Sequence, residues 1–274
     1  MITSKLDRTV TYLILLVFTV VAVLPVLQIV TTAFTSSQAA TPGLRLPDGL
    51  AWHNFVTAWE RGHFGVYLRS SALVTVTVVI ASGLLSTLAA YAFGTMRFPG
   101  STVMFYLFVL GLTIPEEALV IPLYYDFRGL GLTDTYWALI LPQTAQSIAF
   151  GTYWMRTYFA STSPSLIEAA RIDGANSWHI LWRVLVPAGR PAITTMVVIT
   201  FMWTWNEFLL PLVMVSSDSL RTVPLGLAFF SGQHSSEVSL LAAGAVLVAL
   251  PVVVVYLVFQ RRFIEGMLTG AVKE

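Results

Sequence analysis

Long apolar runs, separated by polar stretches rich in glycine, proline and serine, are the main pattern of this sequence. A helix that crosses a bilayer needs roughly 20 mostly apolar residues, because the hydrocarbon core is ~30 Å thick and each residue rises ~1.5 Å. Lipid cannot satisfy exposed backbone groups, so each run is expected to be helical. Six runs qualify: Tyr12–Ala33, Ala72–Phe93, Val103–Leu123, Trp137–Tyr158, Ala192–Val213 and Leu240–Phe259. The pattern predicts an all-α membrane protein with six transmembrane helices in a single domain over residues 1–274.

The composition supports this prediction. Of 274 residues, 56% are hydrophobic and 11% are charged, against roughly a quarter charged in an ordinary soluble domain. So few charges cannot cover the surface of a soluble chain of this length, and the bilayer must cover the rest. The first run is longer than the apolar region of a signal peptide, which favours a retained span. A chain without cysteine has no disulfide or thiolate site, and a net charge of +1 argues against binding to nucleic acid.

The distribution of lysine and arginine predicts the orientation of the six helices. With the N-terminus inside, the cytoplasmic segments hold Lys5, Arg8, Arg97, Arg156, Arg171, Arg183, Arg190, Arg261, Arg262 and Lys273. The outer side then holds Arg45, Arg61, Arg69, Arg128 and Arg221. Ten basic residues against five favour a cytoplasmic location for both termini, since basic residues concentrate in cytoplasmic loops.

The segment 159–191, cytoplasmic in this topology, is predicted to form a helix–turn–helix. Ser163 followed by Pro164 favours a helix start, although Ser165 offers a competing capping box with a start two residues later. Gly174 suits a left-handed residue that closes the first helix. Asn176 or Ser177 can cap a second helix over Trp178–Leu185, which Pro187 is expected to stop. From these residues alone, a docking element and an amphipathic connector on the membrane surface fit equally well.

A motif in this segment resembles the EAA motif of ABC importer permeases. It consists of Glu168-Ala169-Ala170, then Gly174 after three residues, then Val184-x-Val186-Pro187 after nine more, with valines where that family usually has isoleucine and leucine. The resemblance implies a type I ABC importer permease fold, in which this loop is a coupling helix that docks onto an ATPase subunit. The coupling residues it implies are Glu168, Ala169, Ala170, Asp173, Gly174 and Pro187.

Other stretches are similar to carbohydrate-type permeases such as the G subunit of the maltose importer. They include Trp205-Asn206-Glu207-Phe208 in the fifth run and the tail Phe263–Lys273. The resemblance implies a permease for a sugar or related solute, with Gly266, Gly270 and Lys273 in a tail that reaches the ATPase pair. An ABC permease for a non-sugar solute, such as glycerol phosphate or a polyol, remains an alternative.

The chain has no ATP site of its own in its sequence. A P-loop needs a lysine after a glycine-rich turn, and neither Lys5 nor Lys273 follows one. We therefore expect a transport subunit and not an enzyme, with no cofactor bound here and with ATP and Mg on a partner. The resemblance implies a second permease subunit in a heterodimer, two ATPase subunits, an extracytoplasmic solute-binding protein, and a bacterial or archaeal cytoplasmic membrane. Segment 34–71 is either the contact for the binding protein or a solvated connector.

Three glutamates fall inside predicted spans, where a charge is costly and should face protein or water. Trp205, Asn206 and Glu207 combine an apolar ring with hydrogen-bonding groups, as a sugar-handling surface needs, so they are candidates for the translocation path. Pairing of Glu207 with the partner subunit fits equally well. Glu116 and Glu117 lie between two prolines, which predicts a kink or an early helix end at the outer interface and not a role in the pore.

Two other classes of protein explain the sequence less well. A secondary transporter should show matching half-repeats with broken helices, which are not evident, and it would leave the docking loop unexplained. An intramembrane enzyme lacks a His-Glu-x-x-His or Gly-x-Ser-x-Gly signature. The four histidines are scattered without the spacing of metal ligands: His53, His63, His179 and His234. No catalytic or metal-binding residue is therefore predicted.

Overall fold

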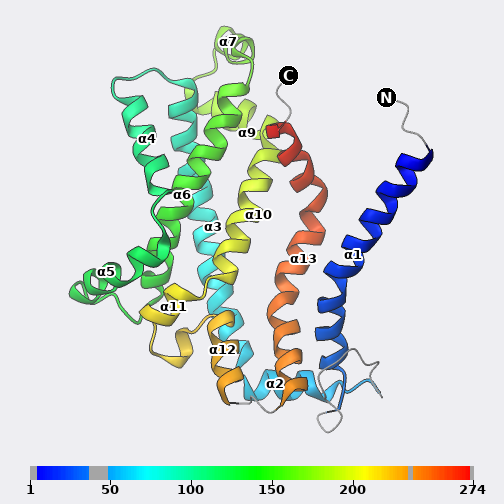
Figure 1. Cartoon of the computed structure of the whole chain (residues 1–274). Helices are drawn as coiled ribbons and strands as arrows, with labels where there is room; N and C mark the ends of the chain where they lie inside the picture. The colour runs from blue at the N-terminus through cyan, green and yellow to red at the C-terminus, as the bar shows by residue number, and fades with distance from the viewer. Residues whose placement is uncertain (1–4, 37–48, 234–236, 272–274) are drawn as a thin grey trace. The chain divides into compact units, whose positions relative to one another are not determined.

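The computed structural model describes residues 5–36, 49–233 and 237–271, which form helices and turns without a strand in these ranges (Figure 1). The α-helices are α1 (Lys5–Ala33), α2 (His53–Arg61), α3 (Phe64–Thr95), α4 (Ser101–Gly111), α5 (Glu116–Gly129), α6 (Tyr136–Ser161), α7 (Pro164–Ile172), α8 (Ser177–His179), α9 (Val186–Ala188), α10 (Arg190–Asn206), α11 (Leu209–Met214), α12 (Val223–Gln233) and α13 (Val238–Ala271). A π-helical segment, η1 (Ile180–Leu185), and a 3₁₀ turn, η2 (Asp218–Leu220), complete the chain. The all-α prediction is confirmed.

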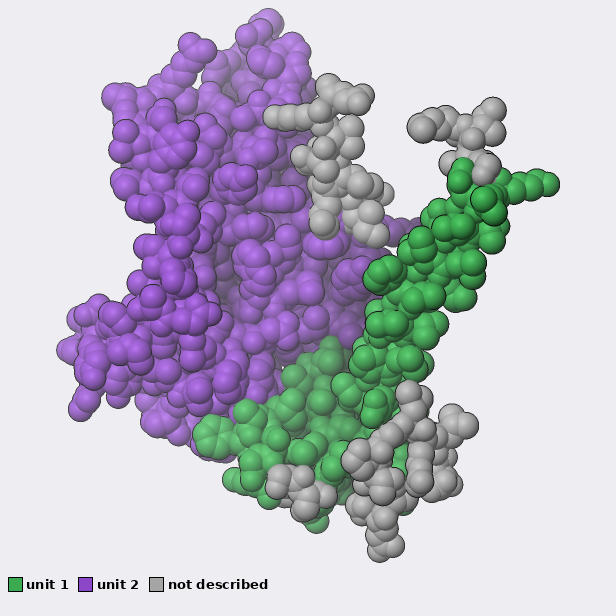
Figure 2. All heavy atoms as spheres, viewed as in Figure 1, with its two compact units in different colours: residues 1–65, 226–250 green, residues 66–225, 251–274 purple. Residues whose placement is uncertain are grey.

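The chain divides into two compact units, coloured separately in Figure 2. Unit 1 comprises residues 1–65 and 226–250, and unit 2 comprises residues 66–225 and 251–274. The chain passes from one unit to the other three times, inside α3, α12 and α13. A single domain over residues 1–274 stays a prediction.

Among the residues that the structure describes, three helices are long and apolar enough to cross a membrane by themselves: α1, α3 and α13. They contain the first, second and sixth predicted spans, and each extends beyond the predicted bounds. The apolar window of α1 is entirely exposed within the chain, as suits a helix surrounded by lipid or by another subunit. The predicted tail after residue 259 is a continuation of α13 to Ala271.

The third and fifth predicted spans are broken; the break in the third was predicted, whereas a continuous helix in the fifth was the wrong prediction. The third consists of α4 and α5, which meet at 95°. Pro115 at the start of α5 has extended backbone angles, so the helix restarts after it, which confirms the break expected from the two prolines. The fifth run ends its first helix, α10, at Asn206 and resumes as α11 at Leu209. Among the described residues, up to five membrane spans result if α4 with α5 counts as one span and Ser177–Ala188 with α10, which meet at 79°, counts as another.

The fourth predicted span corresponds to α6, which has 26 residues. Its sequence is less apolar than those of α1, α3 and α13, because polar residues interrupt it. Several of these polar residues are buried, including Gln143, Ser147 and Thr152. Buried polar side chains in a central helix indicate contact with other helices or with a polar passage, since lipid would not accommodate them.

In unit 1, the segment after α1 is more structured than a loop. The expected loop over residues 34–71 contains all of α2 and the first two turns of α3. Asn54, which is almost completely buried, donates hydrogen bonds of 2.9 Å to the carbonyl oxygens of Ala33 and Thr35. The rings of Phe34, Trp52 and Phe55 pack together beside it. This side chain satisfies carbonyl groups that the end of α1 leaves without helical partners.

Two apolar clusters lie among the described residues of unit 2, and we call them the α11 cluster and the α9 cluster. The α11 cluster consists of Val74, Val78, Val120, Ala138, Leu139, Ile140, Leu210, Met214 and Val215. The α9 cluster consists of Ala90, Tyr91, Met155, Phe159, Ile180, Leu181, Leu185, Ala192 and Met196. Helices α3 and α6 contribute to both clusters, so they connect the two ends of the unit (Figure 1).

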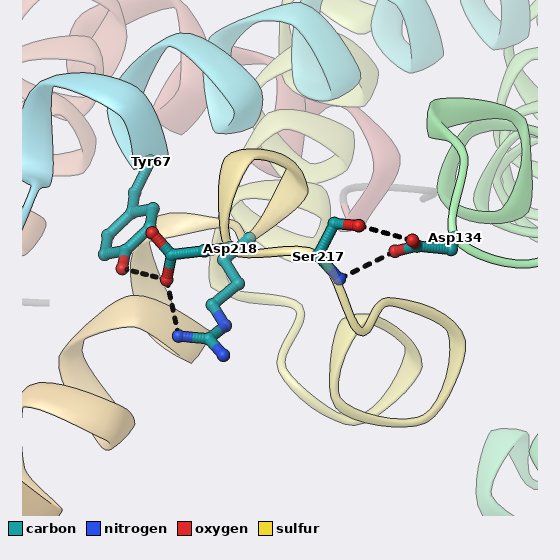
Figure 3. Close-up of polar contacts among 5 residues, drawn as sticks. Tyr67, Asp134, Ser217 and Asp218 are labelled. Carbon is teal, nitrogen blue, oxygen red and sulfur yellow. Dashed lines mark hydrogen bonds and ion pairs between the residues drawn. The ribbon is translucent and has the colours of Figure 1, made fainter.

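Polar contacts hold the segment between α11 and α12 at the end of unit 2 opposite α7 (Figures 1 and 3). Asp218 accepts hydrogen bonds from the Tyr67 hydroxyl at 2.8 Å and from Arg221 at 2.6 Å. Asp134 accepts hydrogen bonds from the backbone N–H of Ser217 at 2.8 Å and from its hydroxyl. These contacts tie the segment to α3 and to the residues that precede α6, so its backbone is held on two sides.

Candidate functional site

The predicted coupling loop begins with a short helix, as the sequence indicates. Helix α7 starts at Pro164 with Ser163 before it, although no side-chain hydrogen bond caps its first turn. The competing capping box with Glu168 therefore does not form, and the Ser163 and Ser165 hydroxyls lie 2.7 Å apart instead. Gly174 has φ of +81°, the left-handed conformation expected of the residue that closes the turn.

The second half of the loop starts as predicted and ends differently. Asn176 caps α8 by accepting a hydrogen bond of 2.9 Å from the backbone N–H of His179. The following turn is the π-helical segment η1, and the chain stays helical through Ala188. The expected end of this helix before Pro187 is wrong by a few residues, since Pro187 lies in the last turn of a helical stretch that continues to Ala188. The stop comes at Gly189, before α10.

The two sides of this loop have different surroundings. Ile180, Leu181 and Leu185 are fully buried in the α9 cluster, and Ile167 and Ala170 of α7 pack against it. Glu168 and Ala169 are exposed, and Glu168 has no hydrogen bond or ion pair among the described residues. Trp178 is 61% exposed. One side of the loop therefore anchors to unit 2, while the other presents a carboxylate, a minimal side chain and a large ring to the exterior.

A second feature of unit 2 is an open hollow of about 680 Å³ between the two apolar clusters. On α6 it lies between Ile140 of the α11 cluster and Met155 of the α9 cluster. On α10 it follows Met196 and precedes α11. The residues that line it are Glu116, Gln143, Gln146, Ser147, Ile199, Met202, Trp203, Thr204, Asn206, Glu207 and Phe263. A hollow inside a set of membrane helices, lined by polar as well as apolar side chains, is where a solute can pass without meeting lipid.

Two carboxylates stand at the two helix breaks and face this hollow. Glu116 is the first residue of α5, directly after the break that follows α4. Glu207 lies in the break between α10 and α11. The two carboxylates lie close enough to interact electrostatically. Each is near the N-terminus of a helix, where the exposed N–H groups stabilise a negative charge.

The residues predicted for the translocation path are not all placed in it. Asn206 and Glu207 line the hollow, whereas Trp205 is 4% exposed, stacks on Phe201 at 5.5 Å and is not part of its lining. The ring that does line it is that of Trp203, which is 54% exposed. Glu116, which the sequence favoured for the outer interface, also faces the hollow, while Glu117 does not.

The amides of Gln143 and Gln146 were not identified as candidates from the sequence. A signal for them was present, because both interrupt an otherwise apolar run. Of the predicted tail residues, Gly266 and Gly270 lie within α13, and Lys273 lies outside the described residues. Among the residues that the structure describes, no group of three or more His, Asp or Glu side chains is placed to hold a metal ion.

Comparison with known proteins identifies the class of this protein. Residues 82–267 match the family described as "Binding-protein-dependent transport system inner membrane component". This stretch is more than half of the chain and includes both the coupling loop and the hollow. The chain therefore belongs to this family of membrane transport components, which confirms the resemblance stated from the motif.

Individual relatives are similar over nearly their whole length. The trehalose transport system permease protein SugB of Mycobacterium tuberculosis is 33% identical, over 92% of this chain and 93% of the relative. The arabinooligosaccharides transport system permease protein AraQ of Halalkalibacterium halodurans is 32% identical, over 92% of each chain. A chain from the crystal structure of a bacterial ABC transporter that imports the acidic polysaccharide alginate matches with a TM-score of 0.82 and 26% identity, over 96% of this chain and 99% of that one. The type I importer permease fold is thereby confirmed.

Proposed function

We propose that this chain is a permease subunit of an ATP-driven importer for a saccharide, and that it forms one half of the translocation path. The observation that carries the proposal is the arrangement of α7, whose inner residues pack on the α9 cluster while Glu168 and Ala169 face outward. A rigidly anchored helix with an exposed carboxylate and exposed small residues suits docking into a cleft on another protein. Saccharide transport is supported by the relatives for trehalose and arabinooligosaccharides.

The assembly proposed for this chain has several partners. A second permease subunit completes the path, since the hollow is open and is lined by one side of α6 and α10. Two ATPase subunits bind ATP and Mg and contact α7, Gly174 and the tail. An external solute-binding protein delivers the saccharide, in keeping with the name of the family. Both termini face the cytoplasm of a bacterial or archaeal cell, and this chain binds no cofactor and catalyses no reaction itself.

Reconstitution of the complete importer in liposomes tests this function. The chain is co-purified with its partner permease and ATPase, and uptake of trehalose and of arabinotriose is measured with the solute-binding protein outside. We expect uptake that requires ATP inside, and two ATPase copies per permease pair. Uptake that needs an ion gradient but no ATPase would instead identify a secondary transporter, and uptake of glycerol phosphate or a polyol alone would replace the saccharide assignment.

A further inference from the structure

The hollow of unit 2 contains a buried hydrogen-bond acceptor without a partner. Gln143 is 5% exposed and lines the hollow. Its amide nitrogen donates to the carbonyl oxygen of Leu139 at 3.0 Å, one turn earlier on α6, whereas its Oε1 atom has no hydrogen-bond partner in the described structure. A buried acceptor left unpaired is unfavourable. Because Gln143 lines the hollow, rotation of its amide toward the hollow would let the hydroxyl of a solute donate to this oxygen.

An aromatic ring and two further amides line the same hollow as Gln143. The ring of Trp203 is held edge-on by Phe150, with centroids 4.7 Å apart, so its orientation is fixed while more than half of the residue is exposed. Gln146 and Asn206 are exposed on the same hollow. An apolar ring face beside amide groups matches the two kinds of surface of a sugar ring, whose C–H groups are apolar and whose hydroxyl groups need partners.

Every ionisable residue in the described lining of the hollow is acidic. Its ionisable members are Glu116 and Glu207, and no arginine, lysine or histidine is among the described lining residues. Both carboxylates stand at helix breaks, where broken membrane helices otherwise offer free N–H groups to an anionic solute. Because the protein's own acidic side chains are placed there, an anion entering the hollow meets two carboxyl groups and no compensating cation among the described lining residues.

Resting on the proposed function, we propose that this subunit itself contacts the transported solute in the hollow, and that the contact surface selects uncharged, hydroxyl-rich saccharides over acidic ones. Trp203 provides the stacking surface, Gln143, Gln146 and Asn206 the hydrogen bonds, and Glu116 with Glu207 the discrimination against anions. The alginate importer has a similar fold but imports an acidic polysaccharide. In this proposal, the two importers differ in the charge of the solute that they accept.

Transport kinetics of the reconstituted importer test the contact. The variant Trp203→Ala should reduce kcat/KM for the transported neutral saccharide about tenfold, and Trp203→Phe should restore most of it, because stacking on an aromatic ring contributes on this scale. The matched control is Trp137→Ala, since Trp137 is also 54% exposed but is not part of the hollow. Unchanged kinetics in Trp203→Ala, with ATP-dependent uptake intact in the wild type, would overturn the contact and leave the proposed function standing.

A chemical test of the charge selection does not depend on the identity of the solute. The chain has no cysteine, so Gln146→Cys introduces a single thiol into the hollow. In the assembled complex, labelling of this thiol by a cationic and an anionic methanethiosulfonate reagent is compared, each relative to its rate with a free thiol. We expect the cationic reagent to be favoured about tenfold, since two nearby carboxylates concentrate cations.

Removal of one carboxylate should weaken this preference. Glu116→Gln in the Gln146→Cys background should reduce it several-fold, whereas the control Glu117→Gln, on the neighbouring residue outside the hollow, should leave it unchanged. Equal relative rates for both reagents before any glutamate is replaced would overturn the charge selection. Efficient ATP-dependent uptake of a trimeric uronate would also overturn it. Loss of all ATP-dependent saccharide uptake in the wild-type importer would instead contradict the proposed function.

Discussion

The backbone N–H of Leu210 donates a hydrogen bond of 2.9 Å to Oε1 of Glu207, so this carboxylate satisfies a backbone group in the first turn of α11. On the other side of the break, the amide of Asn206 donates a hydrogen bond of 2.8 Å to the carbonyl oxygen of Met202, in the last turn of α10. Broken helices within a membrane are tolerated when side chains satisfy the freed backbone groups. Asn206 and Glu207 therefore stabilise the break and line the hollow at the same time.

The hydrogen bond at the break predicts the effect of replacing Glu207. Glu207→Ala should lower the free energy of unfolding by about 1 kcal/mol, because the N–H of Leu210 loses its acceptor. Glu207→Gln should lower the free energy of unfolding by less, since the amide oxygen can accept the same hydrogen bond from Leu210. The measurement is the thermal unfolding midpoint of the purified protein in detergent. Equal midpoints for the alanine and glutamine variants would show that the hydrogen bond does not stabilise the break.

Three helices approach closely at Gly151 of α6, so a side chain added there should lower stability. A β-carbon at this position would lie 2.7 Å from Cβ of Ser86 on α3 and 2.9 Å from Sδ of Met196 on α10. Gly151→Ala should therefore destabilise unit 2 by about 1–3 kcal/mol through overpacking. In Gly111→Ala, the nearest atom would be 3.9 Å away, so this control should change the unfolding midpoint little.

A double-mutant cycle separates overpacking from a general effect of alanine. Ser86→Gly removes the Ser86 atoms that the new β-carbon would meet and leaves only the contact with Met196, so the double variant should be more stable than the sum of the two single changes predicts. Additive changes in the unfolding free energy would show that Ser86 is not the obstacle.

Asp134 predicts a pH dependence of stability. Hydrogen bonds from the hydroxyl and the backbone N–H of Ser217, with a smaller effect from Ser216, hold the pKa of Asp134 below its ordinary value. A carboxyl whose pKa is lower in the folded state adds stability above its unfolded pKa of about 3.9. That stability is lost as the pH falls through the folded pKa. We therefore expect Asp134→Asn to flatten the fall in unfolding midpoint between about pH 5 and pH 2.

Asparagine is the suitable replacement because Asp134 has φ of +57°, a conformation that asparagine also adopts. Ser217→Ala should shift the fall in stability toward higher pH, since it removes the main cause of the lowered pKa. Asp126→Asn, on an exposed carboxyl of α5, controls for the loss of a negative charge. An identical pH profile for the wild type and Asp134→Asn would contradict this assignment.

The exposed face of α7 predicts a specific loss of coupling. Glu168→Lys reverses the charge of an exposed side chain without disturbing the buried contacts of Ile167 and Ala170, so the subunit should fold normally. We expect about tenfold weaker association with the ATPase subunits, measured by co-purification, and a matching loss of ATP-driven uptake. Glu60→Lys, the same charge reversal on exposed α2, should retain both. Wild-type assembly and uptake in Glu168→Lys would exclude a docking role for this residue.

The helices and the coupling loop could be predicted from the sequence because their signals are local. The length of an apolar run is enough to predict a spanning helix in α1, α3 and α13. Each of these signals acts on the turn in which it stands. The start of α7 follows from Ser163 with Pro164, the left-handed turn from Gly174, and the cap of α8 from Asn176, and all three are found where expected. Even the break before α5 followed from its prolines.

The lining of the hollow, by contrast, depends on how distant helices pack. Residues two positions apart on an α-helix differ by about 200° in direction, so Trp203 faces the hollow while Trp205 is buried on the other side of α10. Glu116 and Glu117 are adjacent and differ by about 100° in direction, and Glu116 lines the hollow while Glu117 does not. No local pattern states which face of α10 meets α6, or that a break in the fifth run brings Glu207 near Glu116. The sequence by itself thus determined the helices and the family, and only the tertiary structure decided which side chains line the hollow, because that lining is assembled from residues far apart in the chain.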